Sequence, residues 1–340
     1  MERRDDYDPD RYRFRGLHPG VLLGTASDRY AGWIGQIYTT GRYTGQITRR
    51  PRQIGGRTFK ESVLPVESVA EYFEHFRVLE IDYTFYGLLL DRQGAFTRTY
   101  HTLASYRDQL AEGDSLILKA PQAIFAQKIR RGAGYAPNPD YLNPELFTHC
   151  FYEPARDLLG EHLRAFVFEQ EYQRSGERIP AADLVRSLDA FFGAIPADDR
   201  YHVELRTESY LTGAAFRILE EHGVGQILSH WTWLPTLGAQ FARSGRRFFS
   251  SGRQAVMRLM TPLGTRYEDA YAMAYPFDAL VEGMLQPQMI EDAAQLAREA
   301  VAQGVAMHII VNNRSGGNAP EIARRVACRF AAAESGEPAS

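Results

Sequence analysis

Charged and apolar side chains alternate in the stretch YHVELR, residues 201–206. Neighbouring side chains on an extended strand point to opposite faces, so Glu204 and Arg206 share one face and the apolar residues share the other. A strand with one solvated face would turn both charges to water. If the strand is covered on both faces, the two charges must meet a ligand or each other.

The same pattern recurs at the ends of other apolar stretches: Glu80 and Asp82 in VLEIDYTF, Lys119 in SLILK, Arg258 in VMRLM, and Asn312 and Asn313 in HIIVNN. Carboxylates beside cations favour acid–base chemistry, with Glu80 or Glu204 as the general base and Lys119 as the acid or electrostatic stabiliser. The residues expected to bind and position a substrate are Asp82, Arg206, Arg258, Asn312 and Asn313. The alternative is a purely structural network, because buried charges must be paired whatever the function.

Metal and cofactor chemistry receive less support. Four side chains offer the oxygen and nitrogen atoms that metals prefer: Glu80, Asp82, Glu204 and His230. The cations Lys119, Arg206 and Arg258 in the same set would repel a metal ion, so we predict none. The glycine-bearing segments GTASDRYAG and RSGGNAP match neither a P-loop nor a dinucleotide fingerprint, and we predict no cofactor.

Eight apolar stretches are predicted to be strands: 20–26, 78–85, 115–121, 165–170, 201–206, 225–230, 255–260 and 307–313. Segments with helical spacing of apolar residues lie between many of them, as in 66–73, 184–192 and 290–301. This alternation predicts an α/β fold, a single (β/α)₈ TIM-type barrel with long βα loops at its C-terminal face. The polar residues above would then collect at the carboxyl ends of the strands, where barrel active sites lie.

Composition limits the class of protein. The chain has 340 residues, of which 44% are hydrophobic and 24% charged, which is enough for one large barrel. Its charged start does not resemble a signal peptide and no long apolar run is present, so we expect a cytoplasmic protein that does not enter a membrane. We assign 1–19 to an N-terminal extension, 20–330 to the barrel and 331–340 to a disordered tail. The sequence leaves the oligomeric state open.

Three basic segments are also prominent. Residues 41–60 contain six Lys or Arg residues and no acidic residue, and further clusters occupy 128–131 and 243–253. If all three follow strands, they flank the mouth of the barrel and favour an anionic ligand, because arginine binds phosphate through two hydrogen bonds. The arginines expected to bind this anion are Arg49, Arg50, Arg52, Arg130 and Arg246. A solvated, flexible surface is the alternative.

Four blocks resemble a known family: YFEHFRVLEIDYTFY (72–86), LILKAP (116–121), HVELR (202–206) and VNNRSGGNAPEIA (311–323). They are similar to blocks of the DUF72, or YecE-like, proteins, over roughly residues 20–330. The resemblance implies a TIM-type barrel and no established reaction, and it adds Tyr86 to the expected site. The sequence departs from the family pattern where GTASDRYAGW delays Trp33, at Asp82, and at Met260, which replaces a histidine. We therefore expect a divergent member.

Two functions remain open. The first is an enzyme, a hydrolase, lyase or isomerase, that uses acid–base chemistry on a phosphorylated or otherwise anionic, sugar-like substrate at the mouth of the barrel. The alternative is a barrel that binds or processes nucleic acid through the basic loops 41–60, 128–131 and 243–253. A closed pocket would favour the first, and an open basic groove the second.

Overall fold

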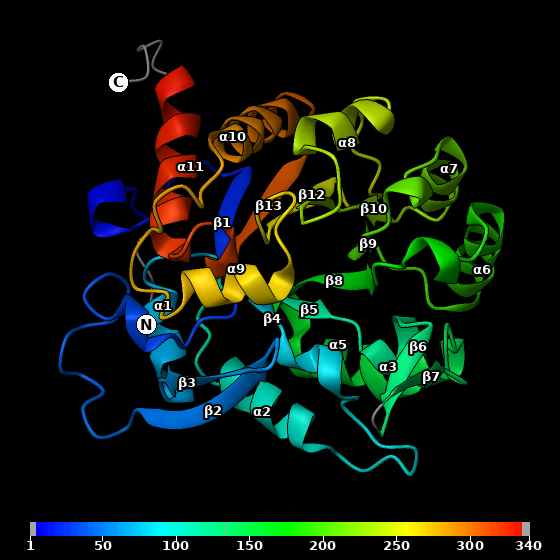
Figure 1. Ribbon diagram of the computed structural model, residues 1–340, viewed down its shortest axis with the longest axis horizontal. Coiled ribbons are helices and arrows are strands. Elements are labelled where there is room, and N and C mark those ends of the chain that lie inside the picture. The colour runs from blue at the N-terminus through cyan, green and yellow to red at the C-terminus, as the bar shows by residue number, and fades with distance from the viewer. Residues whose placement is uncertain (1–4, 133, 335–340) are drawn as a thin grey trace.

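A nearly closed barrel of parallel strands forms the centre of the molecule in the computed structural model, which describes residues 5–132 and 134–334 (Figure 1). Its strands are β1 (Val21–Ala26), β4 (Val78–Ile81), β5 (Ser115–Lys119), β8 (Leu163–Gln170), β9 (Tyr201–Leu205), β10 (Gly225–Gln226), β11 (Leu228–His230), β12 (Gln254–Leu259) and β13 (Ala306–Val311). They pair in the order β10-β9-β8-β5-β4-β1-β13-β12-β11. The predicted barrel is confirmed, because β10 and β11 are two parts of the sixth predicted strand.

The sixth strand changes partner at Ile227. Among the described strands, β10 pairs only with β9, and β11 pairs only with β12. Between them, the N–H of Ile227 still donates to the carbonyl of Val203 on β9 at 2.9 Å. This one short strand therefore joins the two ends of the sheet.

The interior of the barrel is layered, which explains the alternation seen in the sequence. At the amino ends of the strands, Nε2 of His308 lies 3.1 Å from Oε1 of Gln254, and Nε2 of His202 lies 3.2 Å from the Gln254 carbonyl oxygen. Above them is an apolar layer that includes Val78, Ile117, Val167, Val256 and Ile310. Polar side chains two residues further along these strands, most of them charged, form the layer at the carboxyl ends. The intervening residues pack outward against the helices.

Helices surround the strands (Figure 1). They are α1 (Val69–Tyr72), α2 (Arg98–Arg107), α3 (Gln122–Phe125), α4 (Pro144–Phe147), α5 (Glu153–Leu159), α6 (Ala181–Ala194), α7 (Gly213–Glu221), α8 (Leu237–Arg243), α9 (Tyr267–Ala274), α10 (Pro287–Ala302) and α11 (Ala319–Glu334). Capping side chains fix where several of them begin. For example, Thr97 accepts from the N–H of Tyr100 in α2, and Asn318 accepts from the N–H of Glu321 in α11.

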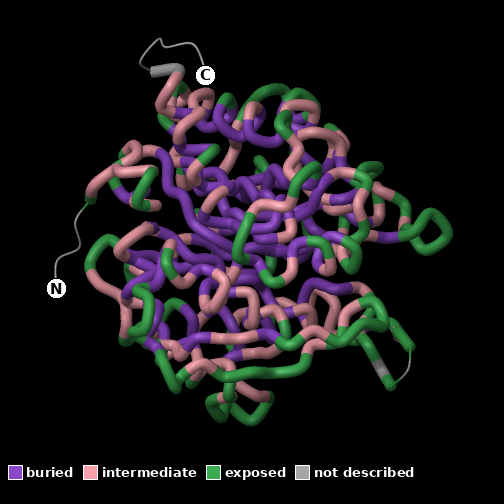
Figure 2. Tube along the Cα trace, turned by 60° about the vertical axis from the view of Figure 1, so that its left-hand side comes forward, coloured by how far each residue is buried: buried purple, intermediate pink, exposed green. Residues whose placement is uncertain are grey.

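Two antiparallel hairpins extend from the carboxyl ends of the strands. β2 (Thr48–Ile54) pairs with β3 (Arg57–Val63) in the long connection that follows β1. β6 (Lys128–Arg131) pairs with β7 (Gly134–Pro137). Figure 2 shows buried residues concentrated in the central barrel and exposed residues along the outer loops and hairpins. The βα connections are thus long, as predicted, and partly ordered as strands.

The N-terminal segment is packed against the opposite end of the barrel. Nη1 of Arg15, a side chain that is only 2% exposed, lies 2.8 Å from Oδ1 of Asp114, directly before β5. The same atom donates to the carbonyls of Phe73 and Phe76 at 2.9 and 3.0 Å. Residues of the predicted extension 1–19 therefore help to close the floor of the barrel.

The predicted C-terminal tail begins too early. Helix α11 continues through Glu334, so 331–334 are helical rather than disordered. Residues 335–340 of the predicted tail lie outside the described residues. No helix within residues 5–132 or 134–334 is long and apolar enough to cross a membrane.

Candidate functional site

Seven charged side chains at the carboxyl ends of the strands form one network of ion pairs: Glu80, Asp82, Lys119, Glu169, Glu204, Arg206 and Arg258. Arg258 lies at its centre and is fully buried. Its Nη2 and Nε atoms lie 2.7 and 2.8 Å from the two carboxylate oxygens of Glu80. Nη1 contacts Glu204 and lies 3.3 Å from Glu169.

Two further cations extend the network toward the mouth. Arg206 lies 2.6 Å from Glu169 and 3.1 Å from Glu204. Nζ of Lys119 lies 2.7 Å from Glu169 and 3.2 Å from Asp82. Oε1 of Glu204 is buried and has no hydrogen-bond partner in the described part of the chain. The alternating charges on the strands thus pair mainly with one another.

The network fixes the charge of Glu169 and Lys119. Burial alone would raise the pKa of Glu169, but the charges of Arg206, Lys119 and Arg258 outweigh it and lower that pKa well below its ordinary value. Burial would lower the pKa of Lys119, but the neighbouring carboxylates of Glu169 and Asp82 raise it above its ordinary value. Near neutral pH, therefore, Glu169 stays ionised and Lys119 stays protonated.

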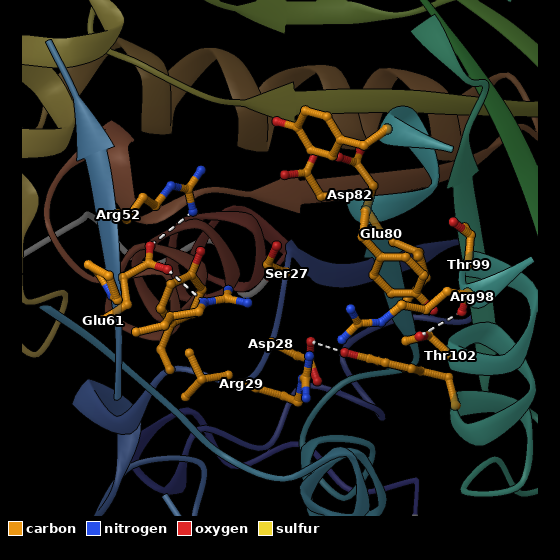
Figure 3. Close-up of a pocket in the computed structure, with 18 residues that line it drawn as sticks. Ser27, Asp28, Arg29, Arg52, Glu61, Glu80, Asp82, Arg98, Thr99 and Thr102 are labelled. Carbon is orange, nitrogen blue, oxygen red and sulfur yellow. Dashed lines mark hydrogen bonds and ion pairs between the residues drawn. The ribbon is translucent and has the colours of Figure 1, made fainter. Parts of the chain in front are cut away.

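A cavity of about 680 Å³ opens beside this network. Its walls come from the segment after β1, the β2–β3 hairpin, the end of β4, the turn that follows β4, and helix α2 (Figure 3). Glu80 and Asp82 are the network members that line it, together with Tyr86 of the turn after β4. The side chains of Lys119, Glu169, Glu204, Arg206 and Arg258 are not among the residues that line this cavity.

Asp28 is a cavity residue that the sequence reasoning missed. The Tyr106 hydroxyl of α2 donates to its Oδ1 at 3.0 Å, whereas its Oδ2 is buried and has no hydrogen-bond partner among the described residues. Burial raises the pKa of Asp28 to about 6, although the neighbouring Arg29 opposes this shift. Its position two residues after β1, at the mouth of the barrel, was the signal that could have identified it.

The backbone beside Asp28 is strained. Ser27 has a φ of 81°, a conformation that side chains other than glycine rarely adopt. Its N–H donates to the carbonyl of Glu80 at 3.2 Å, and the Thr25 hydroxyl donates to the carbonyl of Ser27 at 2.6 Å. Such outliers persist where the surroundings hold them, and they cluster at functional sites.

The two asparagines after β13 serve the local structure. Oδ1 of Asn313 accepts from the indole N–H of Trp33 at 3.1 Å and from the N–H of Ala319 at 2.8 Å. Oδ1 of Asn312 accepts from the N–H of Arg314 at 3.0 Å. These bonds anchor the start of α11 and a buried tryptophan.

The basic segments do not form one surface, so one expectation is wrong. Residues 243–253, including Arg246, follow α8 and precede β12, which places them at the amino ends of the strands, opposite the mouth. The unrecognised helix α8 caused the error. In segment 41–60, Arg50 and Arg52 line the cavity and pair with Glu61 at 3.2 and 2.9 Å. Arg49 and Arg130 are exposed and lie outside the cavity lining.

Within the described ranges, no group of three or more His, Cys, Asp or Glu side chains is placed to hold a metal ion. His230, considered as a ligand from the sequence, instead has its Nδ1 2.9 Å from the carbonyl oxygen of Thr261. Burial lowers its pKa. This histidine therefore belongs to the packing of the sixth strand.

Comparison with known proteins gives a family. Residues 22–339 match the model described as protein of unknown function DUF72. Among solved structures, a DUF72 family protein from Enterococcus faecalis is similar, with a TM-score of 0.54 and 17% identity, covering 92% of this chain and 95% of that one. A DUF72 family protein from Thermotoga maritima has a TM-score of 0.51 and 14% identity, covering 93% and 99%. At such identities the structural likeness establishes the fold alone. No curated protein matches the sequence. Because the family model covers most of its length, the chain belongs to the DUF72 family.

Proposed function

We propose that the protein is an enzyme that transfers protons on a small anionic, sugar-like substrate held in the 680 Å³ cavity. The observation that carries the proposal is Asp28, a carboxyl group in the cavity wall whose pKa is raised to about 6 and whose Oδ2 has no partner in the described part of the chain. A general acid or base works best when its pKa lies near the operating pH. Asp28 meets that condition.

The cavity suits a small molecule. Pockets for small ligands commonly have volumes of about 300–1,000 Å³, and this one lies within that range. Hydroxyl groups of Tyr86, Thr99 and Thr102 and charged groups of both signs contribute to its wall. A substrate with several hydroxyl groups and an anionic group would find a donor or an acceptor on most sides.

The ion-pair network supplies fixed charge rather than mobile protons in this proposal. Its carboxylates, including Glu80, already accept from cations, and Lys119 is held protonated by Glu169 and Asp82. We therefore assign the proton-transfer role to Asp28. Lys119 would keep Asp82 ionised, and Arg258 would hold Glu80 in place at the cavity wall.

No specific observation favours the nucleic-acid alternative. It requires basic segments that are contiguous in space, and 243–253 lies at the far end of the barrel. Two arginines of segment 41–60 are paired with Glu61.

Untargeted turnover provides the test. Purified protein would be incubated with a metabolite extract, and mass spectrometry would identify compounds that change in mass or abundance. We expect wild type to convert an anionic, polyhydroxylated compound, Asp28→Asn to lose this conversion, and the remote control Arg246→Ala to keep it. Conversion that persists in Asp28→Asn, or no conversion by folded wild type, would contradict the proposal.

A further inference from the structure

Besides Asp28, three carboxylates line the cavity, and each of them is paired with a cation. Among its carboxylates, Glu61 pairs with Arg50 and Arg52, Glu80 with Arg258, and Asp82 with Lys119. All of these carboxylates are therefore already neutralised by a cation at hydrogen-bonding distance.

Two guanidinium groups of the wall lack such a partner. Arg29 and Arg98 form no ion pair with a carboxylate within 4.0 Å in residues 5–132 and 134–334. The Nη1 atom of Arg29 donates to the carbonyl of Leu64 at 3.3 Å, and its guanidinium lies 5.6 Å from the centre of the Tyr106 ring. Arg98 is exposed, and Figure 3 shows its side chain extending from α2 into the cavity, toward the side that holds Asp28 and Arg29.

Hydroxyl groups line the same cavity as these two cations. Thr99 and Thr102 lie three residues apart on α2, so they share the face of the helix that lines the cavity. The Thr102 hydroxyl donates its one proton to the carbonyl of Arg98 at 3.0 Å, so among the described residues only the Thr99 hydroxyl of this pair remains free to donate. Oδ2 of Asp28, when protonated, would add one more donor without a partner in the described part of the chain.

We infer that Arg29, Arg98 and Thr99, with Asp28, form a subsite for the phosphate group of a phosphate monoester. Rather than a carboxylate, a tetrahedral dianion with several acceptor oxygens fits two guanidinium groups that approach from different walls together with a hydroxyl donor. This inference rests on the proposed function and names the class of its substrate. Anion binding by the subsite can nevertheless be measured without turnover.

The subsite has a distinctive dependence on pH. Ionised Asp28 repels an anion, whereas protonated Asp28 can donate to it, and burial raises the pKa of this carboxyl to about 6. The other titratable groups facing Asp28 are Arg29, Tyr38, Tyr72, Tyr83 and Tyr106. Burial raises the pKa of all four tyrosines, so they stay neutral between about pH 5 and 8, and Arg29 stays charged. The titration belongs to Asp28 alone.

Sulfate is a suitable probe, because it remains a dianion across this range whereas phosphate titrates. Isothermal titration calorimetry with sodium sulfate at about pH 5 and pH 8, at constant ionic strength, measures the affinity. Wild type should bind more tightly at the lower pH. Arg98→Ala should weaken binding by about tenfold or more, the value expected for losing one charge-assisted contact. Arg107→Ala is the matched control, since Arg107 ends the same helix, is exposed and pairs with Asp108.

Two results would overturn the inference: wild-type sulfate affinity in Arg98→Ala, or a pH dependence that survives in Asp28→Asn. Because sulfate is not converted, failure of this test leaves the turnover test of the proposed function standing. Conversely, sulfate binding with the expected pattern and no turnover would separate an anion-binding protein from the proposed enzyme.

Discussion

Replacing Arg258 by methionine should strongly destabilise the protein. Arg258 is fully buried, and both carboxylate oxygens of Glu80 accept from it at 2.7 and 2.8 Å. Glu80 has no other ion-pair partner in the described residues, whereas Glu204 keeps Arg206 after the substitution. The variant therefore leaves one buried carboxylate without a cation.

The magnitude follows from that single stranded charge. Breaking a buried ion pair by removing one partner costs about 3–5 kcal/mol. The entropy of unfolding is about 2.1 cal/mol/K per residue, or about 0.7 kcal/mol/K for 340 residues. The melting temperature of Arg258→Met should thus fall by about 4–7 °C.

Differential scanning calorimetry and urea unfolding measure this loss. The double variant Arg258→Met/Glu80→Leu removes the stranded charge and should recover about half of the lost free energy of unfolding. Arg247→Ala, which breaks an exposed pair with Glu220, is the control and should cost less than about 1 kcal/mol. The reasoning fails if Arg258→Met costs no more than this control, or if the double variant is no more stable than the single one.

Three smaller changes test other parts of the site. The folded-state pKa of Asp28 is raised from 3.8 to about 6, so ionisation of this carboxyl costs stability as pH rises through this window. Asp28→Asn should therefore stabilise the protein by about 2–3 kcal/mol at about pH 8 and by less at pH 5. Urea unfolding at the two pH values measures the difference. Equal effects at both pH values would contradict the shift. Ser27→Val should cost about 1–3 kcal/mol, and Ser27→Gly clearly less, because of the φ of 81°; equal melting temperatures would argue against strain. Glu61→Gln removes the carboxylate that pairs with Arg50 and Arg52, so the affinity for sulfate, measured by calorimetry, should rise about threefold or more. An unchanged affinity would show that these arginines do not reach the anion.

Local patterns were enough to predict the barrel and the residues of its charged layer, namely the alternation of polar and apolar residues along each strand and of strands and helices along the chain. A strand covered on both faces must turn every second side chain into the interior, and this period is visible in 201–206 without knowledge of the partners. The carboxyl ends of parallel strands meet at one face, so Glu80, Lys119 and Arg258 could be grouped from their positions alone. The ion-pair network follows from the alternation of side chains along parallel strands, and this alternation is visible in the sequence.

Features that depend on contacts between distant segments could not be predicted. The raised pKa of Asp28 arises from burial, and its Tyr106 partner lies 78 positions away in the chain. Strand β2 has a proline at position 51 and no apolar alternation, so its arginines read as a flexible loop until Glu61 is placed opposite them. Segment 243–253 was misplaced because α8 spans only seven residues, too few for a helical spacing of apolar residues to stand out in the sequence.

The change of partner at Ile227 makes the barrel a cylinder with a seam. Two residues of β10 and three of β11 carry the ladders that join the two ends of the sheet, whereas β12 and β13 pair over six. Amides in 225–230 should therefore exchange with solvent before those of the other barrel strands. If the seam opened, the cylinder would unroll into a sheet whose two free edges are β9 and β12. Unpaired strand edges can pair with strands of other chains, so segment 225–230 protects the protein from edge-to-edge association by covering both edges.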